Sequence, residues 1–333
     1  MKRTRNNFKR FLPDWFILGI SSMIFFAWLV PGIGADGQLI ELSKVGQYGI
    51  MLLFFFYGLK LSPEKLLNDL KNWKMHLTIQ AITFVLFPLI VLAFYPFFVH
   101  SQYLTLWMAV FFLSILPGTV SSSVVMVSMA KGNVPGAIFN ASISGMIGII
   151  VTPLWMALFF EKAAGEMDFA KTIIDLVIQI LIPFVLGLAL HRFWGKWANR
   201  NRKYLTLFDK SVILLIVYRS FSNSFIDGVF KTIPNWTLLA LAGAVIALFF
   251  IVYGLSFSIS RWMKFSREEQ ITVVFCGSKK SLVHGSVMAA VLFAGTSMGS
   301  LFLVPIMIFH AFQLFYISIV ARKMGKEQRE LII

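Results

Sequence analysis

Ten apolar segments, each about as long as a bilayer-spanning helix, follow one another along this 333-residue chain. Lipid offers no hydrogen-bond partners to a backbone, so a segment of about 20 apolar residues must satisfy its own amides as a helix. The composition agrees, because 58% of the residues are hydrophobic and the mean hydropathy is +0.79. We therefore expect an all-α integral membrane protein. The expected spans are 14–34, 43–61, 75–98, 103–130, 133–160, 171–193, 208–230, 236–260, 268–293 and 296–322.

Positive charge is distributed unevenly between the two sides of these spans. Of the 30 lysines and arginines, 23 lie in the tails and loops of one side. The other side holds Lys44, Lys162, Lys171 and Lys231. Because positive loops remain cytoplasmic, we expect both termini in the cytoplasm and the protein in the cytoplasmic (inner) membrane. The net charge of +15 then reflects topology and contact with lipid headgroups, and no nucleic-acid partner is expected.

Two of the spans contain residues that interrupt a helix. Pro117 and Gly118 lie in the fourth span, and Gly277 lies among polar residues in the ninth. Proline removes a backbone donor and glycine weakens a helix, so both spans should unwind there. Each break falls in the fourth of five spans, which predicts two inverted five-helix repeats, 14–160 and 171–322. Paired broken helices in inverted repeats are typical of secondary transporters, with the site at the repeat interface.

Two adjacent lysines, Lys279 and Lys280, lie in the second break between Ser278 and Ser281. An ammonium at bilayer depth costs about 2.5–3.5 kcal/mol on insertion scales, so two in one span indicate a use or a partner. The acidic residues of the spans lie near span ends. We therefore expect these four residues to contribute to a binding site, with one lysine lining it while the other snorkels or pairs. The alternative is a lysine that holds the carbonyls of unwound backbone.

Hydroxyl groups gather at the first break, where the N-terminus of a half-helix can hold an anion. They are Thr119, Ser121, Ser122 and Ser123. Three polar residues lie within about one turn of the fifth span and join the candidates: Asn140, Ser142 and Ser144. Asparagine at lipid depth usually makes an interhelical hydrogen bond, and Asn140 is expected either to do so or to face the same break. A single hydroxyl is more often explained by packing between membrane helices than by a ligand. As a cluster opposite a second broken helix, they predict a site for substrate or ion.

Three further residues are secondary candidates for this site. Arg219 is an intramembrane cation whose alternative role is an ion pair with Asp227. His284 and His310 could titrate near neutral pH, although a lone helical histidine is more often structural.

Signals of catalysis are weak in this sequence. Residues 295–299 fit a nucleophile-elbow pattern around Ser297, but that pattern has meaning only between a strand and a helix of a soluble sheet. Lys280 and Ser281 are neighbours whose side chains diverge on a helix, which disfavours a Ser–Lys dyad. The sequence has no metal-ligand spacing or nucleotide-binding motif, and one cysteine, Cys276, forms no intramolecular disulfide. We expect no enzyme, cofactor or metal site, with an intramembrane hydrolase using Ser281 or Ser297 as a lesser alternative.

Three stretches resemble the bile acid:sodium symporter superfamily, and specifically its divergent branch of bacterial YfeH-like proteins and animal solute carrier 10 member 7. These stretches are 54–61, 130–134 and 269–282. The resemblance covers nearly the whole chain and implies ten helices in two domains. A core domain would hold helices 3–5 and 8–10, with helices 4 and 9 crossing where they unwind. A panel domain would hold helices 1, 2, 6 and 7, with substrate in the cleft between the domains.

The chain departs from the sodium-coupled members of that superfamily at the ion sites. Those members carry a glutamate in the ninth-helix break, followed four and five positions later by a glutamine and an asparagine that help bind two sodium ions. Aligned on Gly277, this chain has Phe275, Lys279 and Lys280 there, and residues 121–124 replace a Ser-Asn pair in the fourth helix. Ammonium groups beside a site that lacks its carboxylate repel sodium. We therefore expect a lysine ammonium to occupy a former sodium position, where it either stabilises the crossing without sodium or holds an anionic substrate directly.

These features predict a secondary transporter that works by alternating access and moves a small organic anion across the bilayer. They disfavour sodium as the coupling ion and leave the proton open, since a buried lysine can lose its proton. A second function class is a membrane regulator that transports nothing and acts through partner proteins. The altered sodium site motivates that class, and the short tails disfavour it because they offer no long interaction segment.

Overall fold

The computed structural model describes residues 15–34, 42–61, 72–119, 121–160, 174–293 and 299–330, and every regular element in these ranges is a helix. The elements are α2 (Trp15–Leu29), α3 (Pro31–Gly34), α4 (Leu42–Lys60), α6 (Trp73–Ala81), η2 (Ile82–Leu86), α7 (Phe87–Leu92), α8 (Tyr95–Phe98), α9 (Leu104–Ile115), α10 (Ser121–Met129), α11 (Val134–Phe160), η3 (Val177–Leu181), α13 (Ile182–Ala189), α14 (His191–Arg200), α15 (Arg202–Ile226), η4 (Val229–Thr232), α16 (Asn235–Trp262), α17 (Arg267–Gly277), α18 (Leu282–Leu292) and α19 (Gly299–Glu330).

Several of these helices are long and apolar enough to cross a membrane. Five qualify by length and composition within the described residues: α4, the continuous run α6–η2–α7, α11, α16 and α19. Large apolar side chains such as Phe25, Trp28 and Leu239 point outward from the bundle, as expected for helix faces in contact with lipid. The prediction of an all-helical membrane protein is confirmed for the described chain. The arrangement as ten spans in two inverted repeats stays a prediction.

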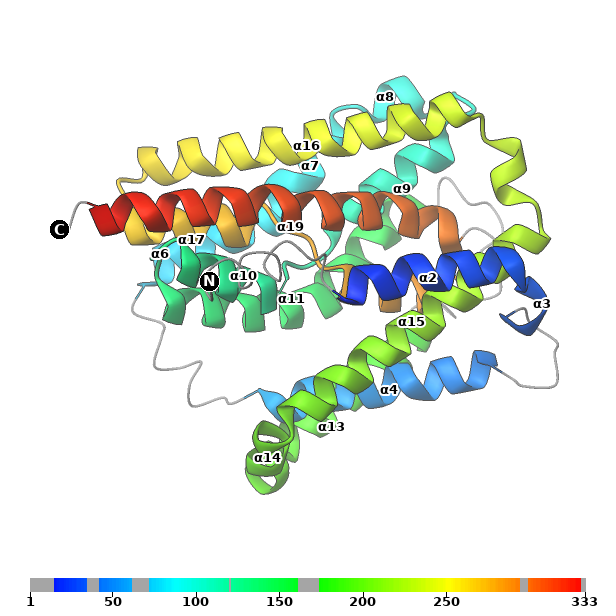
Figure 1. The fold of residues 1–333 in the computed structure, drawn as a ribbon, viewed down its shortest axis with the longest axis horizontal. Coiled ribbons are helices and arrows are strands. Elements are labelled where there is room, and N and C mark those ends of the chain that lie inside the picture. Colours follow the sequence, from blue (N-terminus) through cyan, green and yellow to red (C-terminus); the bar gives the residue numbers. More distant parts are fainter. Residues whose placement is uncertain are drawn as a thin grey trace, which may run out of the picture.

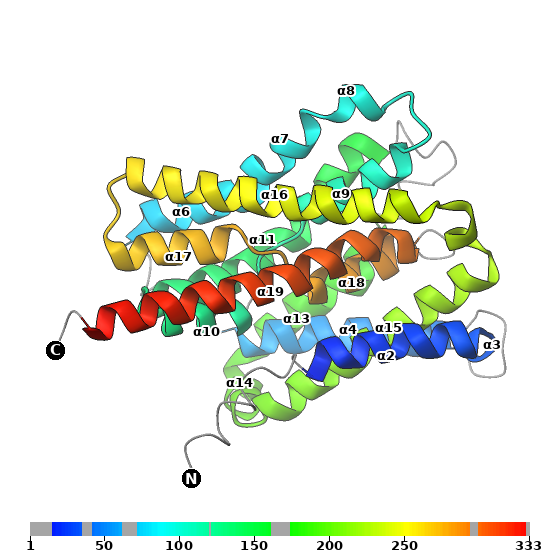
Figure 2. The same cartoon turned by 45° about the horizontal axis from the view of Figure 1, so that its top comes forward.

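The helices form two groups that lie side by side (Figures 1 and 2). In one group, which we call the four-helix group, α4 packs on α13 and α15, and α15 packs on α2. The other group contains α6, α7, α9–α11 and α16–α19, in which α19 packs on α9, α16 and α18. The groups meet where α15 packs against α18 and α19. One continuous core of buried apolar side chains extends through both groups.

Two glycines set the distance between α4 and α13. A Cβ atom on Gly58 would collide with the carbonyl oxygen of Phe184, and one on Gly187 would collide with that of Phe55. Each backbone therefore approaches the other where it has no side chain, which is how small residues allow close helix packing in membranes. This reciprocal contact joins the predicted second and sixth spans.

The predicted boundaries of spans six and seven were wrong. The sixth span ends at Ala189, where the chain turns by 96° into α14, and α15 begins at Arg202 rather than 208. Residues 191–193 were assigned to the sixth span and those from 194 to a loop, but together they form the helix α14, which has exposed Phe193 and Trp194 and three basic residues. This run is too polar to span a bilayer and amphipathic enough to lie along its surface.

The predicted third span also ends early, since a turn after Leu92 separates α7 from α8.

A methyl group at Gly58 should strain the contact between α4 and α13. We expect Gly58→Ala to destabilise the protein by about 1–3 kcal/mol, because neither backbone can move without repacking. Gly254→Ala is the matched control, since a Cβ there meets nothing within 4 Å and a helical glycine is up to about 1 kcal/mol worse than alanine. The apparent melting temperature of the two purified variants measures the difference. An unchanged value for Gly58→Ala would show that the helices are not in close contact.

Candidate functional site at two broken helices

The two predicted breaks are present, and they touch. The helix is interrupted between α9 and α10, and again between α17 and α18. The backbone N–H of Ser281 in the second break donates to the carbonyl of Pro117 in the first, at 2.9 Å. A Cβ on Gly118 would lie 3.4 Å from the carbonyl oxygen of Cys276, so the two segments of the chain cross in van der Waals contact.

Lys280 places a cation at this crossing. Its ammonium donates to the carbonyl oxygens of Thr83 at 2.7 Å, Ser114 at 2.6 Å and Leu116 at 2.8 Å. The side chain is fully buried, and Nζ lies 4.3 Å from the centre of the Phe87 ring. An ammonium has three N–H donors, so these carbonyls saturate it. Lys280 therefore holds unwound backbone, as in the alternative interpretation, and retains no donor for a substrate.

The local backbone explains why two of these carbonyls are free. In the π-helical turn η2, the N–H of Phe87 donates to Ile82 instead of Thr83, and the next residue, Pro88, has no N–H. In the first break, the N–H of Gly118 would complete a helical bond to Ser114, but it donates to Ser144 Oγ at 2.9 Å. Each rearrangement leaves an acceptor for Lys280.

A glutamine fixes the backbone of Lys280 from the side of α19. The Lys280 N–H donates to Gln313 Oε1 at 2.9 Å, and Gln313 Nε2 donates to the Lys280 carbonyl at 2.8 Å. His310, a secondary candidate, lies here too, with Nδ1 2.8 Å from Gln313 Nε2. Sequence reasoning missed Gln313 and Thr83. A glutamine within an otherwise apolar span was the available signal for the first.

Lys279 points into the predicted hydroxyl cluster. Its Nζ donates to Ser122 Oγ at 3.4 Å, a long and therefore weak contact. Ser122 Oγ donates to Thr119 Oγ1 at 2.8 Å, and Thr119 Oγ1 lies 2.8 Å from Ser123 Oγ. Lys279 is fully buried, so neither lysine snorkels. The side chain of Ser121 lies outside the described part of the chain.

The two serines that flank the lysines bond locally. Ser278 Oγ donates to the carbonyl of Val274 in its own helix at 2.6 Å. Ser281 caps α18, with its Oγ 3.3 Å from the His284 N–H and 2.9 Å from His284 Nδ1. A base is thus within reach of Ser281, but both side chains are buried and the Ser281 hydroxyl also caps α18. Ser297 lies outside the described residues.

The fifth span contributes one of its three predicted residues. Ser144 bonds the first break, as described above. Asn140 is one turn further away and instead meets α6, with Nδ2 2.7 Å from His76 Nδ1 and Oδ1 3.1 Å from Gln80 Nε2. Ser142 bonds the carbonyl of Ile138 and faces outward. Asn140 thus makes the interhelical hydrogen bond that is usual for asparagine at this depth, and Ser142 lies on another side of α11 from Ser144 because residues two apart on a helix diverge.

Arg219 lies apart from the crossing. It lines a small, partly open pocket between α4, α15, α18 and the start of α19. The lining residues are Leu42, Gly46, Gln47, Ile50, Leu215, Ile216, Arg219, Ser220, Asn223, Ala289, Ala290, Phe293 and Gly299. His284 marks another contact between the two groups, with its ring 5.4 Å from that of Tyr57 in α4.

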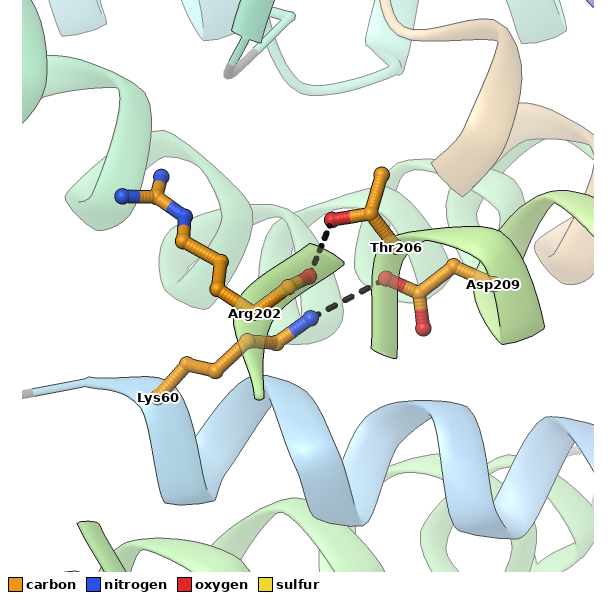
Figure 3. A network of polar contacts seen from close by, with 4 residues as sticks. All are labelled: Lys60, Arg202, Thr206 and Asp209. Carbon is orange, nitrogen blue, oxygen red and sulfur yellow. Dashed lines mark hydrogen bonds and ion pairs between the residues drawn. The ribbon is translucent and has the colours of Figure 1, made fainter. Parts of the chain in front are cut away.

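An ion pair inside the four-helix group was not predicted. Lys60, counted from the sequence as a loop residue, ends α4 and lies 3.0 Å from Asp209 Oδ2 in α15 (Figure 3). Both side chains are largely buried, and Lys60 also lies 4.6 Å from the centre of the Tyr57 ring. Thr206 is directed to the carbonyl of Arg202 and not to the pair.

The sequence profile of the SBF-like CPA transporter family matches residues 14–326, which is nearly the whole chain. The chain belongs to this family. Over 96% of its length, it is 35% identical to the Escherichia coli protein named "Putative symporter YfeH", with 95% of that protein covered. Over 92%, it is 31% identical to the Xenopus tropicalis protein named "Sodium/bile acid cotransporter 7", with 90% covered. An uncharacterised protein of Pseudomonas aeruginosa is 38% identical over 96% of this chain and 95% of its own length.

Membership of the SBF-like family confirms the resemblance to the bile acid:sodium symporter superfamily. It also gives the crossing of two broken helices a context of transport rather than of catalysis, since the family and the named relatives are transporters or symporters.

The two lysines of this SBF-like transporter should differ in their effect on stability. Lys280→Met leaves three buried carbonyls without donors, and we expect a loss of roughly 3 kcal/mol or more. Lys279→Met removes one long contact and should cost less than about 1 kcal/mol. The apparent melting temperatures of the two variants in one detergent test this difference. Equal shifts would contradict the assignment of Lys280 as the structural cation.

The Lys60–Asp209 pair should behave as a buried ion pair. Lys60→Met leaves the carboxylate of Asp209 without its partner, which typically costs about 3–5 kcal/mol. The double variant Lys60→Met/Asp209→Leu should regain most of that loss, because apolar replacements of a buried pair are often neutral. Thermal unfolding of both variants decides the matter, and a double variant no more stable than Lys60→Met would refute the buried pair.

Proposed function

We propose that this protein is a secondary transporter that works by alternating access, moves a small organic anion, and uses a lysine ammonium where sodium-coupled relatives use an ion. The observation that carries the proposal is the Lys280 ammonium, fully buried among three backbone carbonyls where two broken helices cross. Oxygen ligands of this kind bind hard cations such as metal ions. The Lys280 ammonium is covalently attached to the chain, so it holds the three carbonyls and the crossing together without an ion that could dissociate.

The proposed architecture has ten spans in two inverted repeats, 14–160 and 171–322, with a core domain and a panel domain. The packing of the four-helix group supports it, because α4 packs on α13 and α15 packs on α2. In the predicted numbering, the second span packs on the sixth and the seventh on the first. Exchanging the two halves converts one pairing into the other, as a two-fold relation requires. The panel would be this group, and both termini would be cytoplasmic.

The proposed binding site is the hydroxyl cluster beside Lys279. Thr119, Ser122 and Ser123 form a connected set of hydroxyl groups, and Lys279 adds one weakly held ammonium. On giving up its proton, Lys280 would keep two N–H donors for three carbonyls and would turn a lone pair toward the third, whereas Lys279 has one long contact at stake. Lys279 is therefore the better candidate for a proton that moves during transport, with the cation-free state favouring release of the anion.

Ligand-dependent stability tests this function directly. We expect one class of organic anion to raise the apparent melting temperature in the absence of sodium, because a ligand that binds only folded protein stabilises it. Ser122→Ala and Lys279→Gln should lose most of that increase. Ser142→Ala, whose hydroxyl faces away from the site, should retain it. A rise produced by sodium alone would contradict the proposal and restore a conventional sodium-coupled mechanism.

A further inference from the structure

The helix α14 lies at one end of the four-helix group and crosswise to its spanning helices (Figure 1). The chain bends by 96° between the segment that ends at Ala189 and α14. That segment includes α13, which packs along the span α4, so α14 runs parallel to the membrane surface. His191 Nδ1 lies 2.8 Å from the carbonyl oxygen of Leu59, next to the last residue of α4. This contact places α14 at the level where a span ends, which is the level of the lipid headgroups.

The first two faces of α14 are apolar and differ in what they contact. Gly195 and Ala198 are buried and hold the helix against the group, where Ala198 packs with Leu59 and Leu205. With 3.6 residues per turn, three exposed aromatic side chains fall together on the next face. These residues, which we call the aromatic face, are Phe193, Trp194 and Trp197. Tryptophan is enriched where headgroups meet the acyl chains, so this face fits that boundary.

The third face of α14 is basic. Arg192, Lys196 and Arg200 recur at every fourth position, so they form a row along one side of the helix, and all three are exposed. Arg202 and Lys203 follow at the start of α15 and are exposed too. No acidic residue occurs in the sequence from 191 to 208. This basic row therefore presents a strong positive potential directly beside the aromatic face.

We propose that α14 is a binding site for anionic phospholipids. The basic row of Arg192, Lys196 and Arg200 holds the phosphate-bearing headgroups, and the aromatic face inserts among the upper parts of the acyl chains. Charge complementarity selects an anionic occupant, and guanidinium groups pair well with phosphate oxygens. The adjoining aromatic face selects an occupant that is also apolar. At the level where a span ends, an anionic lipid of the bilayer surface has both properties.

A lipid at this site would act on the four-helix group as a whole. The α14 helix is joined to α4 through the contact of His191 with Leu59 and through the ring of Trp197, which lies 6.5 Å from that of Phe56. Bound lipid would therefore fix the ends of α4 and α15 at the membrane surface. The site requires neither a transported substrate nor a coupling ion, and it is independent of the transport function proposed above.

Quenching by spin-labelled lipids measures the preference directly. Cys276 is the single cysteine of the chain, so Cys276→Ala/Phe193→Cys carries one thiol on the aromatic face for a bimane label. The full chain is reconstituted in phosphatidylcholine vesicles with a small fraction of acyl-chain nitroxide lipid, either phosphatidylglycerol or phosphatidylcholine. We expect phosphatidylglycerol to reach half-maximal quenching at a mole fraction lower by about fivefold or more, because basic side chains near the surface attract anionic lipid. Equal quenching by the two lipids overturns the lipid site and leaves the basic row to an acidic protein partner.

Charge variants in the same labelled background assign the preference to α14. Changing all three residues of the basic row to glutamine should abolish most of it. Arg192→Lys/Arg200→Lys, which keeps the charges, should retain it. The matched control removes three exposed basic residues from the turn between α16 and α17 and should also retain it: Arg261→Gln/Lys264→Gln/Arg267→Gln. A preference that persists without the basic row, or that the control loses equally, overturns the proposal.

Soluble phosphates distinguish a lipid from a free anion. In detergent, we expect dioleoylphosphatidylglycerol to raise the apparent melting temperature, because a ligand that binds only folded protein stabilises it. Sodium phosphate and sn-glycerol 3-phosphate at the same concentration should not, since they offer nothing to the aromatic face. An equal rise with the soluble phosphates would assign the basic row to a free anion, and it overturns the lipid site, as does the absence of a rise with the lipid.

Discussion

The ammonium of Lys280 bonds three carbonyls that belong to two different parts of the fold. One comes from the π-helical turn η2, and two come from the last turn of α9 and the break that follows it. An unpaired backbone carbonyl in a membrane interior costs several kcal/mol, so neither irregular segment would persist there without a donor. Lys280 supplies that donor from a third segment, the break before α18. The crossing therefore depends on one side chain that is common to three elements.

The neighbouring lysine shows that the hydrogen bonds of a buried ammonium depend on its immediate surroundings. Lys279 and Lys280 are adjacent and equally buried, yet one has three short hydrogen bonds and the other a single long one. The backbone between α17 and α18 is irregular, and the two ammonium groups reach different partners. A rigid cation and a weakly held cation thus occur within one irregular turn. Gln313 maintains this geometry, since it bonds both the N–H and the carbonyl of Lys280.

The sequence could predict what depends on neighbouring residues. Apolar runs of membrane length, the proline and glycine at the first break and the polar run at the second are local signals, and the corresponding helices and breaks are present. The partners of Lys280 were beyond reach, because Thr83 and Ser114 are distant in sequence and become acceptors only through backbone irregularities. Which of its two expected partners Asn140 takes depends on α6, which is distant in sequence. The α14 helix was missed because length and hydropathy were read without its amphipathic period.

The two helix groups are held together internally by contacts that differ from those between them. Within the four-helix group, the backbones of α4 and α13 touch at Gly58 and Gly187, and Lys60 pairs with Asp209. Such contacts are specific and do not slide. Between the groups, the contacts include the aromatic ring of Tyr57 against His284 and the packing of α15 on α18, with a pocket beside them. Domain movement requires rigid bodies joined by packing that has more than one arrangement. In the proposed alternating access, the contacts within the four-helix group keep it rigid, and the contacts between the two groups rearrange. Arg219 and Lys279, one on each group, would then change their separation as the groups move.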